Sequence, residues 1–103
     1  DAHLMKAEAI LNGASGGNGL ALVNELRALR GASPMAALTE QTLLDERGRE
    51  LYIEGWRRND QIRLGDWSNP WEFKSSTDAY RALYPIPSTA LISNPNLTQN
   101  EGY

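Results

Sequence analysis

The stretch Leu44-Asp-Glu-Arg-Gly-Arg-Glu-Leu-Tyr-Ile-Glu-Gly-Trp-Arg-Arg-Asn-Asp-Gln-Ile-Arg63 interleaves acidic and basic residues and decides the fold. Three glutamates and an arginine follow one another at steps of four, four and three, so they share one helix face if the helix continues past Gly55. Interleaved signs give each carboxylate a cationic partner, which allows partial burial. We therefore predict a structural ion-pair network of Glu46, Arg47, Glu50, Glu54, Arg57, Asp60 and Arg63, with Arg49 and Arg58 as further cations.

Acid–base catalysis or metal binding is the alternative reading of these carboxylates. The Glu-x-x-His pairing of a di-iron site is missing, and His3 is the only histidine, so a metal site lacks ligands. Glycosidase carboxylates flank a sugar from separate positions, and no such pair can be identified here. The Gly13–Gly17 match to G-x-S-x-G follows a predicted helix, whereas a nucleophile elbow needs a strand. We expect no catalytic residue, no metal and no cofactor.

The elements around this stretch are predicted to be helical. The third helix of the chain begins after Thr39, a suitable N-cap, and runs to Glu54. Gly48 lies in its interior at a cost of ~1 kcal/mol relative to alanine, which suggests that another group packs closely there. A short helix is predicted from about Arg57 to Leu64. The apolar side of the third helix consists of Leu43, Leu44, Leu51 and Ile53.

Two further helices are predicted upstream, over residues 1–12 and 19–30. The short Gly/Ser-rich loop between them favours antiparallel pairing, as in a tetratricopeptide hairpin. Apolar residues recur at helical spacing on both helices. The predicted buried stripes are Leu4, Ala7 and Leu11 in the first helix, and Leu22, Leu26 and Leu29 in the second, with Val23 flanking them.

The C-terminal part is predicted to be mostly irregular. Residues 65–79 read as a loop, and Asp78 to Leu83 as one helical turn. From Tyr84 onward, prolines and asparagines predict an extended tail. Its expected apolar contacts are Ile86, Leu91, Ile92 and Leu97. No strand pair is visible, so the predicted fold class is all-α: a tetratricopeptide-like helical hairpin, further helices and a long Pro/Asn-rich tail.

Composition limits the class of partner. The 103 residues carry a formal net charge of −3, which argues against a dedicated nucleic-acid binder but not against neutral partners such as sugars. No apolar run approaches the roughly 20 residues that span a bilayer. Aromatic rings in a polar loop can stack on sugars, or can cover other parts of the protein. The candidate glycan contacts are Trp67, Trp71 and Phe73, whereas Tyr52 and Trp56 are expected in the core.

Several motifs together resemble the SusD/RagB family. Residues 44–65 are similar to its signature Glu-Arg-x-x-Glu-Leu, then Glu-Gly, a short helix with Asp and Arg, and Gly. The matching residues are Glu46, Arg47, Glu50, Leu51, Glu54, Gly55, Asp60, Arg63 and Gly65. The tail 83–103 resembles the closing segment of the family, Pro-Ile-Pro followed by Asn-Pro-x-Leu-x-Gln-Asn-Pro-Gly-Tyr, although Glu101 stands where proline is preferred. Residues 4–9 and 24–31 resemble the helical hairpin that precedes the signature.

The resemblance implies that residues 1–103 are the C-terminal portion of a single SusD/RagB-like domain in a larger protein. Members of this family are non-catalytic lipoproteins on the outer face of the outer membrane, held by an N-terminal lipid. They bind oligosaccharides or polysaccharides, sometimes peptides, and deliver them to a SusC-like TonB-dependent transporter. The main sugar contacts of the family lie upstream of this segment, which is expected to act mainly as scaffold. The alternatives are a carboxylate-dependent glycan hydrolase and a stand-alone tetratricopeptide-like protein-interaction module.

Overall fold

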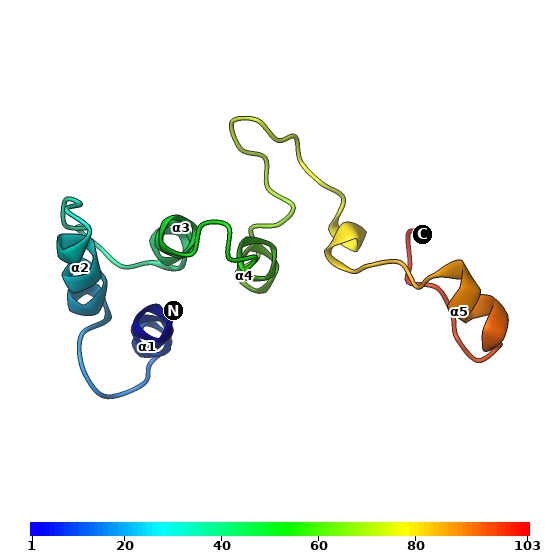
Figure 1. Ribbon diagram of the computed structural model, residues 1–103, viewed down its shortest axis with the longest axis horizontal. Helices are drawn as coiled ribbons and strands as arrows, with labels where there is room; N and C mark the ends of the chain where they lie inside the picture. Colours follow the sequence, from blue (N-terminus) through cyan, green and yellow to red (C-terminus); the bar gives the residue numbers. More distant parts are fainter. The chain divides into compact units, whose positions relative to one another are not determined.

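The computed structural model describes all 103 residues as two compact units, Asp1–Leu64 and Gly65–Tyr103. The first unit contains helices α1 (Ala2–Leu11), α2 (Gly19–Leu29), α3 (Glu40–Glu50) and α4 (Arg57–Arg63), and the second contains the 3-10 helix η1 (Ala79–Ala82) and α5 (Ser88–Ser93) (Figure 1). No strand forms, and the single β-bridge joins Trp71 and Lys74. The predicted all-α class is confirmed. None of these helices combines the length and the apolar character that crossing a lipid bilayer requires.

Helices α1 and α2 form the predicted hairpin. His3, near the start of α1, contacts the carbonyl of Leu22, whereas the middle of α1 meets the first residue of α2, so the two helices run in opposite directions. That meeting point requires glycine, because a Cβ on Gly19 would lie 2.8 Å from the carbonyl oxygen of Ala7. The Asn18 side chain caps α2 by accepting a hydrogen bond from the N–H of Ala21.

The core of the first unit lies between α1, α2 and α3. Its fully buried side chains are Leu4, Ala7, Val23 and Leu43. Leu29 was wrongly predicted to join this core and is 76% exposed, because it lies in the last turn of α2 while the buried line of that helix runs through Val23. Truncating a fully buried leucine in such a core costs roughly 2–5 kcal/mol.

Helix α3 begins as predicted but ends earlier. The Thr39 side chain accepts from the N–H of Thr42 in a reciprocal capping box. The helix was predicted to run to Glu54, but it ends at Glu50, and the chain reverses through residues 51–55. Ile53 has a φ of 67° and is 86% exposed, so its predicted place on the buried side is wrong. Tyr52 was likewise wrongly predicted to lie in the core: it falls in the same reversal and is 76% exposed.

The reversal after α3 has a tertiary cause. It returns the chain so that the Arg57 guanidinium packs on Gly48 and donates to the carbonyl oxygen of Leu44 at 2.7 Å. A Cβ on Gly48 would lie 2.8 Å from Arg57 Nη1, so a larger residue at this position would make the end of the Arg57 side chain shift. The close packing expected at this position is therefore confirmed.

The second unit is more regular than predicted. The turn expected between Asp78 and Leu83 is present as η1, but helix α5 occupies part of the tail that was expected to be extended. Pro87 precedes α5, and a proline is compatible with the start of a helix because no intrahelical partner is needed for its missing N–H. Of the expected apolar contacts, Ile86 and Leu91 are half-buried, whereas Ile92 and Leu97 are exposed.

Side-chain amides hold the C-terminal segment against the segment before α5. Gln99 accepts from the N–H of Ile86 at 2.8 Å and donates to its carbonyl oxygen at 2.9 Å, so it pairs with the backbone as a neighbouring strand would. The amide of Asn100 donates to the carbonyl oxygen of Tyr84 at 2.7 Å. These bonds satisfy backbone groups in a segment without ladder partners.

The last residues complete this closure. The Tyr103 hydroxyl donates to the carbonyl oxygen of Leu83 at 2.9 Å, and its ring meets that of Tyr80 edge to face, with centroids 5.0 Å apart. Gly102 has a φ of 93° and lies so close to the Tyr80 ring that a Cβ would collide with it. The Gly-Tyr ending therefore has a defined structural role.

Candidate functional site

A buried ion pair joins α3 to α4. Arg47 Nε donates to Asp60 Oδ2 at 2.8 Å, and both side chains are 4% exposed. Arg63 donates to the other oxygen of Asp60 at 3.0 Å and also pairs with both carboxylate oxygens of Glu8 on α1. Hydrogen bonding to Glu8 raises the pKa of Arg63 above its ordinary value. Three helices are thus held by one connected set of charges.

A second set of ion pairs joins α3 to α2. Glu46 accepts from Arg27 at 2.5 Å and from Arg49 at 2.8 Å. Glu50 is bound in bidentate fashion by Arg30, at 3.0 Å and 2.6 Å. The hydrogen bonds from Arg30 hold the pKa of Glu50 below its ordinary value. Glu46 and Glu50 of α3 are therefore acceptors for arginines of the hairpin.

The structure brings together most, but not all, of the residues predicted for the network. Glu54 is excluded, because α3 ends before it and leaves it exposed without an ion pair. Arg57 bonds a backbone carbonyl instead of a carboxylate. The sequence interpretation also missed the partners on α1 and α2. The missed partners are Asp1, Glu8, Arg27 and Arg30. The available signal was the spacing of like charges: the two arginines lie three residues apart, and Glu46 and Glu50 lie four residues apart.

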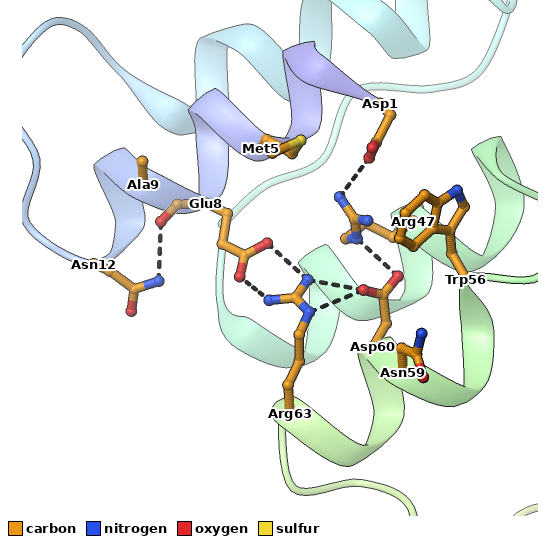
Figure 2. Close-up of a pocket in the computed structure, with 10 residues that line it drawn as sticks. All are labelled: Asp1, Met5, Glu8, Ala9, Asn12, Arg47, Trp56, Asn59, Asp60 and Arg63. Atoms are coloured by element: carbon orange, nitrogen blue, oxygen red, sulfur yellow. Dashed lines mark hydrogen bonds and ion pairs between the residues drawn. The ribbon is translucent and has the colours of Figure 1, made fainter.

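The first set of charges lies in the wall of a pocket of about 420 Å³. Figure 2 shows α1 on one side of this pocket and α4 on the other, with Arg47 and Trp56 between them. Its polar groups are carboxylates, amides and guanidinium groups, and its apolar groups include an indole ring and a thioether. The lining residues are Asp1, Met5, Glu8, Ala9, Asn12, Arg47, Trp56, Asn59, Asp60 and Arg63. We call this hollow the α1–α4 pocket.

Two features of the α1–α4 pocket were not predicted. Trp56 was expected in the core, yet it is 43% exposed because it stands just before α4 at the edge of the pocket. Arg47 Nη1 is buried and has no hydrogen-bond partner. It lies 3.0 Å from Asp1 Oδ1, an ion-pair distance without hydrogen-bond geometry. The pocket therefore offers an aromatic face beside an incompletely satisfied cation.

The loop aromatics proposed as glycan contacts lie in the second unit. Trp67 is half-buried, with Lys74 Nζ 5.8 Å from its ring centroid and bonded to its carbonyl oxygen. Trp71 and Phe73 are exposed, Phe73 by 85%. None of the three lines the α1–α4 pocket. No group of three or more His, Asp or Glu side chains is arranged to hold a metal ion.

Comparison with known proteins identifies the family of the chain. The sequence profile of the SusD family matches residues 1–103. The chain is 38% identical over 113 residues to the Starch-binding protein SusD of Bacteroides thetaiotaomicron, in an alignment that covers 100% of this chain and 20% of that relative. The chain thus spans a fifth of the length of that protein. With a family profile matched from the first residue to the last, the chain belongs to the SusD family.

Proposed function

We propose that this chain is the C-terminal portion of a single SusD-like domain in a larger protein that binds oligosaccharides or polysaccharides without cleaving them. The family match over residues 1–103 supports glycan binding, as does the similarity to a protein whose name states that it binds starch. The chain covers one fifth of that relative, so the function belongs to the intact protein.

Within the intact protein, this segment acts mainly as helical scaffold. The observation that carries this proposal is the Arg47–Asp60 ion pair, in which each side chain is 4% exposed. Arg63 binds the same aspartate and also pairs with Glu8, so the ion pair is linked to α1. Removing one partner of such a buried pair is costly, because the remaining charge keeps its desolvation penalty. A set of charges that connects three helices therefore fixes their relative positions.

The same contacts argue against hydrolysis. A glycosidase needs one carboxyl group that protonates the leaving oxygen and a second carboxylate that acts as base or nucleophile. Here Glu46, Glu50 and Asp60 each accept hydrogen bonds from arginine. Glu50 in particular has a lowered pKa and does not hold a proton near neutral pH. The geometry favours anions that serve as structural partners.

We further propose that the intact protein is held on the outer face of the outer membrane by an N-terminal lipid and delivers glycans to a SusC-like TonB-dependent transporter. This proposal rests on the family resemblance. Affinity purification of the tagged intact protein from solubilised membranes tests it. The expected main partner is a TonB-dependent barrel; a set of unrelated soluble proteins would instead favour a general protein-interaction module.

Calorimetric titration of the intact protein tests glycan binding itself. Suitable probes are maltoheptaose, cellohexaose, xylohexaose and mannohexaose, each added to a few tens of micromolar protein. Saturable binding of at least one neutral oligosaccharide is expected. Absence of binding for these probes and for soluble starch would contradict the proposal.

A further inference from the structure

We propose that the α1–α4 pocket is a sugar-binding subsite, in which one pyranose ring stacks on Trp56 and its hydroxyl groups bond to the surrounding amides and charged side chains. This inference rests on the proposed glycan-binding function and adds a location and a ligand class to it. The volume of about 420 Å³ lies within the roughly 300–1,000 Å³ typical of small-molecule sites.

The apolar part of the pocket suits the C–H face of a sugar. Trp56 presents a partly exposed indole ring, and Met5 and Ala9 of α1 are exposed across from it (Figure 2). An aromatic ring offers a flat, weakly hydrated surface, so covering it with aliphatic hydrogens removes apolar area from water. Trp56 stands just before α4, so its backbone lies beside the buried ion pairs.

The polar part of the pocket supplies donors and acceptors for hydroxyl groups. The Asn59 side-chain amide is exposed at the pocket and makes no hydrogen bond within the chain. Arg47 is nine-tenths buried or more, and its Nη1 lacks a hydrogen bond while facing Asp1. The Asp1 side chain is 32% exposed, so its carboxylate can accept from a ligand hydroxyl while it keeps its ion pair with Arg47.

Charge selects the class of sugar. The pocket contains three carboxylates and two guanidinium groups, which already pair with one another. An acidic sugar would meet an excess of negative charge and would have to break existing pairs, at the high cost of unpaired buried charge. Hydroxyl groups can join the same groups without displacing them. We therefore assign the subsite to neutral sugars, not to uronic acids or sulfated glycans.

The test uses the intact protein, with maltoheptaose as first probe and the other neutral oligosaccharides as alternatives. Replacing Trp56 with alanine should weaken binding by about tenfold or more, and Trp56→Phe should restore much of the affinity, because a ring remains. Tyr52→Ala is the matched control: it removes an exposed aromatic side chain outside the pocket and should leave Kd unchanged.

Hydrogen exchange with and without the sugar gives a second readout that needs no variant. Residues 1–12 and 56–63 should become protected upon binding. Unchanged Kd in Trp56→Ala, or protection confined to other parts of the protein, would overturn the subsite while leaving glycan binding intact. A lowered Tm of Trp56→Ala with unchanged Kd would show that another segment covers the ring. Failure of the wild-type protein to bind any probe would instead refute the proposed function.

Discussion

Replacing Arg47 with alanine should open the contact between α3 and α4. In the wild-type protein Arg47 Nε lies 2.8 Å from Asp60 Oδ2, and both side chains are almost fully buried. Without Arg47, the Asp60 carboxylate keeps only Arg63, which is itself 40% exposed. Water must then enter, or α4 must move, to solvate the carboxylate.

The expected cost follows from this geometry. Removing one partner of a buried ion pair costs about 3–5 kcal/mol, and the remaining bond from Arg63 places this variant near the lower limit. Arg49→Ala is the matched control on the same helix. Its side chain is 58% exposed, and Glu46 keeps Arg27, so the loss should stay below about 1 kcal/mol.

Amide hydrogen exchange of the intact protein is the appropriate assay, because it reports local opening of α3 and α4. A loss of about 3 kcal/mol corresponds to exchange roughly a hundredfold faster in these helices. A combined Arg47→Met and Asp60→Leu variant should recover much of the protection, since an apolar pair carries no desolvation penalty. Equal exchange rates in Arg47→Ala and Arg49→Ala would refute the argument from burial.

Three further changes test other parts of the account. Leu51→Ala should cost about 2–5 kcal/mol by leaving a cavity beside α3, measured as faster exchange in that helix. Arg30 keeps the folded pKa of Glu50 below its ordinary 4.5. The contribution of Glu50 to stability is therefore complete above that value and is lost as pH falls through the folded pKa. Glu50→Gln should abolish this pH-dependent contribution, measured by urea unfolding from pH 7 to pH 3. Gly102→Ala should loosen the C-terminal closure, because the new Cβ meets the Tyr80 ring, and exchange in residues 83–103 should rise.

Each of these changes has a control on the same chain. Ile53→Ala removes an exposed side chain and should have little effect compared with Leu51→Ala. Glu54→Gln removes an exposed carboxylate without an ion pair, so it should leave the acid limb of the unfolding curve unchanged. Gly16, like Gly102, has a positive φ, but a Cβ on Gly16 would meet no neighbouring atom. Gly16→Ala therefore shows the effect of backbone strain without the collision with the Tyr80 ring. Equal effects within a pair would contradict the proposed cause.

The helices were predictable from sequence because their signals are local. Thr39 could be identified as an N-cap, and glycines mark the ends of the hairpin helices. The end of α3 could not be predicted in this way. It depends on the return of Arg57 to Gly48, a contact that is set by tertiary packing. In the tail, Pro87 was read as a breaker although it precedes a helix.

The site was less predictable than the fold. Alternating charges correctly indicated that carboxylates would meet arginines, but local spacing does not reveal which ones. Glu46 meets Arg27 of α2 because the hairpin packs beside α3. The exposure of Trp56 likewise depends on how α4 meets α1. That Trp67, Trp71 and Phe73 contact glycan stays a prediction, as does the assignment of residues 1–103 to one domain of a larger protein.

The most direct test of the account is to incubate the purified intact protein with starch and with other neutral polysaccharides, measuring bound protein and newly formed reducing ends in the same samples. We predict that the protein sediments with at least one polysaccharide and that reducing ends stay at the level of the protein-free control. Reducing ends that accumulate with the wild-type protein would contradict the account. Their loss in Glu46→Gln or Asp60→Asn variants that still sediment with the polysaccharide would show that these carboxylates do chemistry instead of holding the scaffold together.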